Sequence, residues 1–272
     1  MPFIPDSLRL LIISYYFPPL NLVSSFRLGA FAKYLPTHGI RPTVLTLRWQ
    51  ALPGPDIDLA GAYAWHEPGA SDVTEDLHGS RVIRLPRVRT HCQRFIDRTL
   101  RLPGLSSCIA LLANFGGFFD LELLYAHFAF KRFLRKHLSI AHYDAVIATM
   151  APPEHLRLGA WMNQHTGTPF IADYRDTYDN RIMSTTFRPS WRERLGIDLK
   201  RHYHRRWMRR CSLLVSVSRP LLRMLSQELR VGNSVEVRNG YDPDLLEPQT
   251  DMIDRRDVRL IYYGQIYPRQ MR

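Results

Sequence analysis

Short apolar runs alternate with longer amphipathic segments along most of the chain. The runs are rich in Val, Ile and Leu, and most of them stop at Pro, Gly, Asp or Asn, which is typical of buried strands. Because the runs are nearly continuous in apolar residues, we expect both faces of the sheet to be covered. We predict strands at residues 8–14, 41–47, 82–86, 143–149, 167–173, 213–218, 235–238 and 258–264.

The segments between these runs predict helices. Ser24 is suited to cap a helix that continues to about Leu35, because Leu28, Phe31 and Leu35 then share one face. Residues 50–80 are rich in Pro, Gly, Ala and Asp and indicate a long irregular segment instead. Further helices are predicted at 92–138, with breaks near 103–104 and 116–117, at 153–165, at 191–209 and after Pro220.

Strands that alternate with helices indicate an α/β protein with a doubly wound parallel sheet. A polar segment, 242–257, separates this pattern from the last predicted strand. That strand has neither a crossover helix nor a neighbouring strand after it in this sequence, and a parallel strand needs both. We therefore interpret residues 1–241 as one domain, 242–257 as a linker, and 258–272 as the beginning of a second domain.

The excess of basic over acidic residues is compatible with an anionic partner. The 272 residues carry 37 Lys plus Arg against 25 Asp plus Glu, a net charge of +12, and nearly all the basic residues are Arg. An arginine-rich genome composition explains this as well as a phosphorylated substrate, an acidic lipid or nucleic acid does. The three cysteines, Cys92, Cys108 and Cys211, form no close pair, which argues against a disulfide framework and fits a reducing cytoplasm.

Two predicted helices have basic faces that suit an anionic membrane surface. Solvated faces on a basic protein are the alternative. The apolar-rich segment 102–119 is interrupted by Pro, Gly and Ser, so it predicts surface contact and not a spanning helix. No nucleic-acid-binding module is recognisable, and we expect no nucleic-acid partner. The basic faces consist of Lys131, Arg132, Arg135 and Lys136 in one helix and Arg201, Arg205 and Arg209 in the other.

Candidate catalytic and binding residues are sought where the predicted strands end, since ligands of open α/β sheets bind at the carboxyl ends of the strands. Asp173, Arg175 and Asp176 follow one predicted strand. Two carboxylates beside an arginine can hold the hydroxyls of a sugar, or can orient a nucleophilic hydroxyl and take its proton. The alternative is a buried Arg–Asp pair that braces the loop, or caps for the following helix.

The loop after the first strand lacks the glycines of a phosphate-cradling loop, so no dinucleotide fingerprint is present. Ser24, Ser25 and Arg27 at the following helix start can still meet a phosphate, or can serve only as caps. The histidines are scattered, and His202 and His204 face apart on a helix. We therefore predict no metal site.

Several motifs follow one another along the chain: Leu-Ile-Ile-Ser-Tyr-Tyr-Phe-Pro-Pro at 11–19, the segments 26–39 and 42–46, the run 143–149 with Pro152-Pro153, the segment 169–176, and 215–218, 237–243 and 258–267. In type and order these motifs resemble those of family 4 glycosyltransferases with the GT-B fold, in which a Rossmann-like acceptor domain precedes a donor-binding domain. The resemblance covers nearly the whole chain.

The resemblance implies that residues 1–241 are a Rossmann-like acceptor-binding domain and that 258–272 is the first strand of a truncated donor-binding domain. It implies a transfer that retains configuration, from a nucleotide-sugar to a polysaccharide or glycolipid acceptor of the cell envelope, without cofactor or metal. By this resemblance the catalytic residues are Asp173, Arg175 and Asp176. The acceptor-binding residues are Pro19, Ser24, Ser25, Arg27, Pro153 and Glu154, and the donor-binding residues are Ser218, Asn239, Gly240, Gly264 and Arg269.

Three positions depart from the family's pattern. The family's glycines after the first strand are replaced by residues 20–25, its strand-end histidine is replaced by Arg175, and its basic residue after Gly264 arrives only at Arg269. Without a complete donor domain, we expect these 272 residues alone not to transfer sugar. The alternatives are an inactive acceptor-binding or membrane-docking remnant and a nucleotide-sugar epimerase of the same fold. We expect a cytoplasmic location, peripheral to the inner face of the cell membrane.

Overall fold

The computed structural model describes residues 7–20, 22–49, 66–67, 69–88, 98, 112–117, 124–137, 142–150, 152–177 and 190–245. The chain divides into two compact units, residues 1–240 and 241–272. Within the described residues, the second unit contains one short 3₁₀ helix, η2 (Pro243–Leu245). The sheet and the α-helices considered below belong to the first unit.

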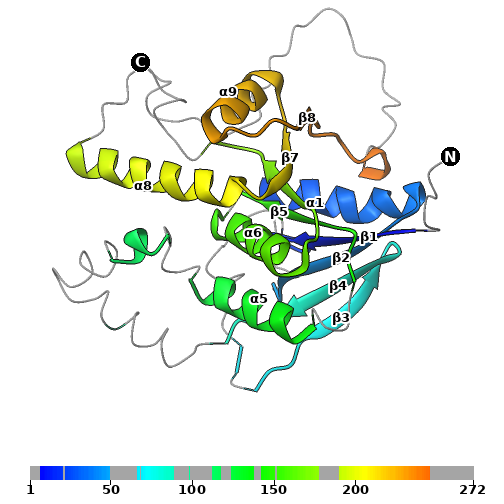
Figure 1. The fold of residues 1–272 in the computed structure, drawn as a ribbon. Helices are drawn as coiled ribbons and strands as arrows, with labels where there is room; N and C mark the ends of the chain where they lie inside the picture. Colours follow the sequence, from blue (N-terminus) through cyan, green and yellow to red (C-terminus); the bar gives the residue numbers. More distant parts are fainter. Residues whose placement is uncertain are drawn as a thin grey trace, which may run out of the picture. The chain divides into compact units, whose positions relative to one another are not determined.

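Eight strands among the described residues form one sheet in the order β3-β4-β2-β1-β5-β6-β7-β8 (Figure 1). All neighbouring strands are parallel except β3 and β4. The strand order runs outward from β1 in both directions, which confirms the predicted doubly wound, Rossmann-like sheet. The strands are β1 (Leu8–Ile13), β2 (Ile40–Leu47), β3 (Val73–Leu77), β4 (Ser80–Leu85), β5 (Ala145–Thr149), β6 (Phe170–Tyr174), β7 (Cys211–Ser216) and β8 (Ser234–Glu236).

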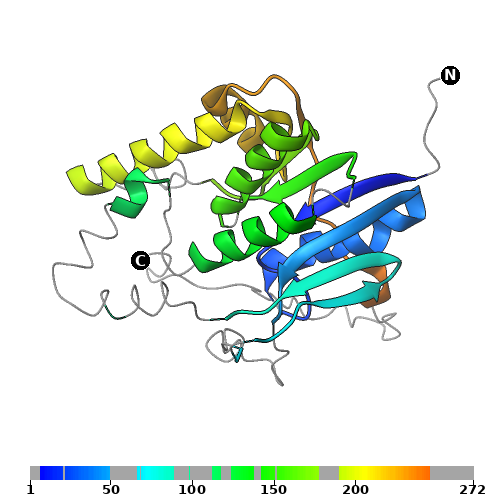
Figure 2. The same ribbon diagram turned by 60° about the horizontal axis from the view of Figure 1, so that its bottom comes forward.

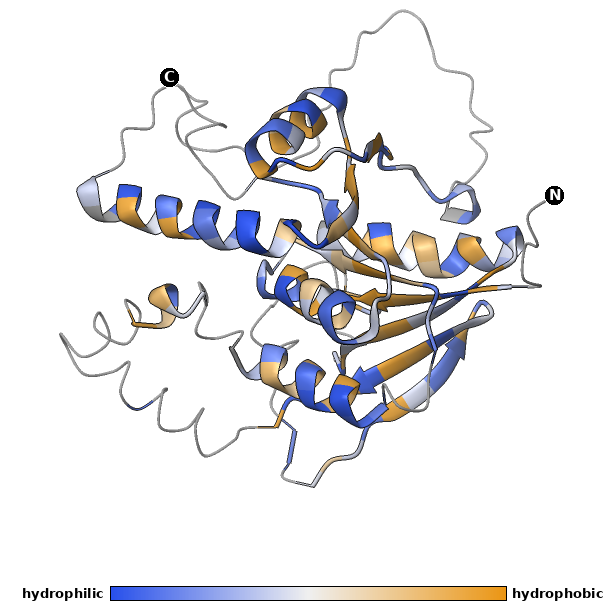
Figure 3. Ribbon diagram, in the orientation of Figure 1, coloured by the Kyte–Doolittle hydropathy of each residue, from blue (hydrophilic) through white to orange (hydrophobic). Residues whose placement is uncertain are grey.

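Helices cover the two faces of this sheet unequally (Figures 1 and 2). Leu10 and Ile12 of β1 pack with α1, whereas Leu11 and Ile13 belong to the core that contains α5, α6, α8 and α9 residues. Figure 3 shows strands that are mostly apolar and helices that are apolar on one side only. The helices are α1 (Val23–Tyr34), η1 (Leu35–His38), α5 (Leu124–His137), α6 (Glu154–Thr166), α8 (Trp191–Met208) and α9 (Arg219–Leu229).

Strand β3 corrects the prediction of an irregular segment over residues 50–80. It is an edge strand that forms a hairpin with β4, and the turn residues His78 and Gly79 have φ values of 54° and 82°. The strand was missed because it is polar and buries no side chain fully. Its Glu75 instead binds Arg84 of β4, with 2.6 Å between Oε1 and Nη2.

The start of α1 corrects the predicted cap at Ser24. The helix begins at Val23, with Leu22 in the cap position. The hydroxyl of Ser25 turns inward, accepts the backbone N–H of Leu22 at 3.3 Å and lies against the carbonyls of Leu20 and Leu22. The predicted strand 258–264 lies outside the described residues, as does most of the predicted helical region before α5.

Gly159 of α6 provides a direct test of how this helix packs on the sheet. A Cβ atom on Gly159 would lie 2.2 Å from Cε2 of the buried Phe170 ring in β6. We expect Gly159→Ala to lower the free energy of unfolding by about 1–3 kcal/mol, because an overpacked core must shift. Urea unfolding followed by circular dichroism measures this change.

Gly196→Ala in α8 is the matched control, since among the described residues no atom beyond its chain neighbours and its own helix backbone lies within 4 Å of the added Cβ. Alanine is the better helix former, so this variant should gain roughly 0.5–1 kcal/mol. Equal stability of Gly159→Ala and the parent would contradict the close packing of α6 on β6.

Candidate functional site

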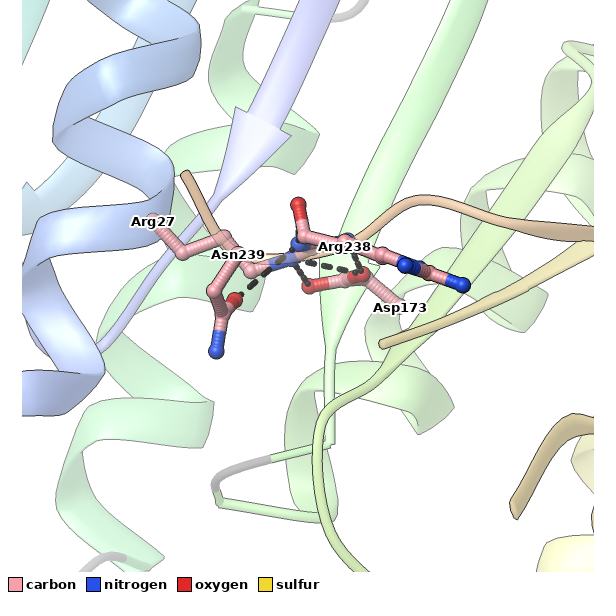
Figure 4. Close-up of polar contacts among 4 residues, drawn as sticks. All are labelled: Arg27, Asp173, Arg238 and Asn239. Atoms are coloured by element: carbon pink, nitrogen blue, oxygen red, sulfur yellow. Dashed lines mark hydrogen bonds and ion pairs between the residues drawn. The ribbon is translucent and has the colours of Figure 1, made fainter. Parts of the chain in front are cut away.

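A polar cluster joins three distant segments at the carboxyl edge of the sheet (Figure 4). Arg27 comes from α1, Asp173 from the end of β6, and Arg238 and Asn239 from the segment after β8. The Nε and Nη2 atoms of Arg27 donate to the Asp173 carboxylate over 3.0–3.2 Å. Its Nη1 donates to the Asn239 side-chain oxygen at 3.2 Å and to the Arg238 carbonyl at 3.4 Å. One guanidinium therefore holds two loops together.

This ion pair is almost completely removed from solvent. The side chains of Arg27 and Asp173 are 5% and 2% exposed, and the Arg27 guanidinium also lies 5.0 Å from the centre of the Phe31 ring. Burial raises the pKa of Asp173 above its ordinary value, while the hydrogen bonds and the charge of Arg27 oppose that shift. Since the hydrogen bonds stabilise the ionised form, Asp173 is suited to brace the site.

The sequence left open whether Asp173 contacts substrate or forms a buried Arg–Asp pair that braces the loop. The structure contains the buried pair. The partner is Arg27, 146 positions away, and not the neighbouring Arg175. Arg175 instead approaches Asp176, with 3.6 Å between Nη2 and Oδ2. Asp176 is 62% exposed, so it is the more accessible carboxylate of this loop.

The predicted acceptor-binding residues divide between the two faces of the sheet. Arg27 lies on the α1 face, whereas Glu154 begins α6 on the other face and is buried. The Glu154 carbonyl lies 3.3 Å from Nδ1 of His127 in α5. Pro19 is exposed, Ser25 is buried, and Ser24 and Pro153 are intermediate in exposure.

The structure describes three of the five predicted donor-binding residues. Asn239 joins the Arg27 cluster, and Gly240 has open space where a side chain would begin. Ser218 precedes α9, and its carbonyl accepts the backbone N–H of Leu222 at 2.9 Å. Gly264 and Arg269 lie outside the described residues.

A second ion-pair group fixes the segment that carries Asn239. Glu236, at the end of β8, accepts from Nε of Arg238 at 2.6 Å and from Nε of Arg219 at 2.9 Å. The hydrogen bond from Arg238 is the main reason that the pKa of Glu236 is lowered. The cluster around Arg27 is thus held from β8 as well as from β6.

An apolar cavity of about 460 Å³ lies on the α1 face beside Asp173. Among the described helices, α1 contributes Phe31 to its lining and η1 contributes Leu35. The remaining apolar lining comes from the strands and from the segment after β8: Leu8, Leu10, Ile40, Ala145, Ile147, Ile171, Leu213, Val215, Val235 and Val237.

Metal ligands do not gather in the part of the chain that the structure describes, where no three His, Cys, Asp or Glu side chains form a group suited to a metal ion. Within the same part, no helix has the length and apolar character needed to span a membrane.

Sequence reasoning missed the partnership between Arg27 and Asp173, although it selected both residues. Each stands near the carboxyl end of a strand, which was the signal that selected them. Their pairing depends on the order of β1, β5 and β6 in the sheet, and no local pattern encodes that order.

Neither a family model nor a curated protein sequence matches this chain. Among solved structures, the chain is similar to sucrose-phosphate synthase from Thermosynechococcus elongatus, with a TM-score of 0.49 and 12% identity over 86% of this chain and 49% of that one. A second structure of sucrose-phosphate synthase from that organism gives a TM-score of 0.45 and 12% identity over 85% and 89% of the two chains. This chain spans about half the length of the first.

Proposed function

We propose that this chain is the acceptor-binding half of a glycosyltransferase with the GT-B fold. The complete enzyme would transfer a sugar with retention from a nucleotide-sugar to a polysaccharide or glycolipid acceptor at the cytoplasmic face of the cell membrane. The observation that carries the proposal is the buried Arg27–Asp173 pair, which joins the loop after β6 to Asn239 at the carboxyl edge of the sheet. The order of motifs along the chain, which resembles that family, supports it.

The site lies where this fold class binds ligands. The strand order turns at β1 and β5, and ligands of doubly wound sheets bind outside the carboxyl ends of the strands at such a switch point. Arg27 follows β1 in the chain and Asp173 ends the strand next to β5. The brace between them fixes the backbone on both sides of the region where an acceptor would bind.

The accessible groups at this edge have the chemistry that sugar recognition needs. Asp176 and Asn239 are exposed, and their carboxylate and amide can accept from and donate to sugar hydroxyls. We assign Asp176, supported by Arg175, to orienting the acceptor hydroxyl and taking its proton, and Asp173 to positioning the loop.

The domain assignment remains part of the proposal: residues 1–241 bind the acceptor, 242–257 link the domains and 258–272 begin the donor domain. The proposed contacts to the nucleotide-sugar are those that the resemblance implies: Ser218, Asn239, Gly240, Gly264 and Arg269. The diphosphate that leaves would be stabilised in the donor domain, where its charge develops.

Binding to an array of saccharides and lipid-linked saccharides tests this proposal. We expect the chain to bind at least one array member and Asp176→Asn/Asn239→Ala to weaken that binding roughly 10-fold, since charge-assisted hydrogen bonds contribute about 1.5–3 kcal/mol. Arg223→Gln, an exposed change on α9, is the control and should bind as the parent does. Binding that survives the double substitution would contradict the site.

A turnover assay tests the division into domains separately. The 272-residue chain is incubated with nucleotide-sugars and with the saccharide that it binds on the array. We expect this chain alone to transfer no sugar. Transfer by this chain would contradict the assignment of the donor site to another domain, and release of an epimerised sugar without acceptor would favour the epimerase reading.

A further inference from the structure

A cationic groove lies between α5, α6 and α8, the three helices that pack side by side on one face of the sheet (Figures 1 and 2). Its volume is about 720 Å³, within the range of small-molecule sites. The described residues that line it include no Asp or Glu. Its five cationic side chains are Lys131, Arg157, Arg206, Arg209 and Arg210.

Two arginines of α8 contact Glu228 of α9 through their guanidinium groups. Toward α9, Arg201 binds Glu228 with 2.7 Å between Nε and Oε1, and Arg205 donates to the Glu228 carbonyl at 2.8 Å. Two of the three arginines of the predicted basic face, Arg201 and Arg205, are thus engaged with α9. Toward the groove, Arg206 and the following Arg209 and Arg210 form no side-chain ion pair within the described part of the chain.

The groove side of α5 and α6 carries positive charge in the same way. Nη1 of Arg157 donates to the Gly116 carbonyl at 3.0 Å, which fixes its guanidinium at the groove wall. Burial lowers the pKa of Arg157, the charge of Arg206 adds to that shift, and the charge of Glu154 opposes it. Lys131 stands over the Trp161 ring, with 5.6 Å from Nζ to the ring centre, and Arg135 lies 5.9 Å from the same centre. Arg157 and Lys131 are therefore held at the groove wall by these contacts.

Burial is the main cause of the lowered pKa values of two groups in the groove, and neighbouring cations add to it. Burial, then Arg135 and Arg157, lower the pKa of Lys131. Burial, and after it the charges of Arg157 and Lys131, lower the pKa of His127 to about 3. An anion in the groove would relieve this mutual repulsion.

We infer that the cationic groove binds a ligand through a phosphate monoester or diphosphate group. Arginine is the residue suited to bidentate contacts with phosphate oxygens, and a groove with several arginines and no lining carboxylate favours a multiply charged anion. The phosphate can belong to a lipid headgroup or to a free phosphorylated molecule. The groove lies on the face of the sheet opposite α1 and Arg27, so this inference does not depend on the proposed acceptor site.

Two matched triple variants test the inference. The first, Arg206→Gln/Arg209→Gln/Arg210→Gln, removes three charges from the groove. The second, Arg132→Gln/Lys136→Gln/Arg223→Gln, removes three charges from exposed positions outside it. All six side chains are exposed, so both variants should keep the parent's circular dichroism and thermal midpoint.

The probes are inorganic pyrophosphate, measured by calorimetry, and vesicles of phosphatidylcholine with and without phosphatidic acid, measured by sedimentation, at about 0.15 M salt. We expect the groove variant to lose at least 10-fold in affinity for one probe, and the control variant to lose less than 3-fold. Loss confined to pyrophosphate identifies a free phosphorylated ligand, and loss confined to phosphatidic acid vesicles identifies a lipid headgroup. Equal losses in both variants, or no binding of either probe by the parent, would overturn the inference.

Discussion

Asp173→Asn should lower the free energy of unfolding by about 3–5 kcal/mol, the largest effect that we expect from a single substitution. The change leaves the Arg27 guanidinium, only 5% exposed, without its counter-charge. Taking an unpaired cation out of water is far more costly than burying a pair. Urea unfolding at neutral pH measures the loss.

Asp176→Asn is the control for this experiment. Asp176 is 62% exposed, so its substitution should change stability by no more than about 0.5 kcal/mol. The double variant Arg27→Met/Asp173→Leu removes both charges and should recover most of the lost stability, as replaced buried pairs do.

The double variant also tests whether the Arg27–Asp173 pair positions the two loops or only stabilises the fold. If the pair positions the loops after β6 and β8, the double variant should fold well and still bind the saccharide poorly, because Asn239 loses the Arg27 contact at 3.2 Å. Full saccharide binding by the double variant would show that the pair contributes to folding alone. A loss below about 1 kcal/mol in Asp173→Asn would contradict the pairing itself.

Acidification should destabilise the protein before its carboxylates titrate. Burial is the main cause that lowers the pKa of His127, His155 and His204 from 6.5 to about 3. Between these values the unfolded chain binds protons that the folded chain does not, so stability rises with pH and is lost as pH falls below about 6.5. At about pH 5.5, each histidine should account for a loss of roughly 1.4 kcal/mol, about 4 kcal/mol for all three.

Two variants identify the groups responsible. His155 packs between the rings of Tyr15 and Phe130, with centroid distances of 6.0 and 5.1 Å. His155→Phe preserves a ring there and should reduce the slope of stability against pH by about a third between pH 6 and 5. His202→Gln is the control, since His202 is exposed and its substitution should leave the slope unchanged. An unchanged slope in His155→Phe would contradict the assignment.

The sequence by itself determined the class of fold. Apolar-rich runs predicted seven of the described strands within a few residues. For six of them the signal is burial on both faces of a parallel sheet, whereas β8 is largely exposed. The same reasoning selected Arg27 and Asp173, since the carboxyl ends of parallel strands share one edge. Asn239 was selected by the family resemblance. The search for apolar runs missed β3, whose polar side chains carry no such signature.

Only the tertiary structure decided which charges are neutralised. Asp173 pairs with Arg27, 146 positions away, and not with its neighbour Arg175, because the strand order brings α1 to the end of β6. The arginines of α8 divide in the same way: Arg201 meets Glu228 of α9, whereas Arg206 faces the groove. Ion pairs and grooves depend on which elements become neighbours, and a local pattern of residues does not contain that information.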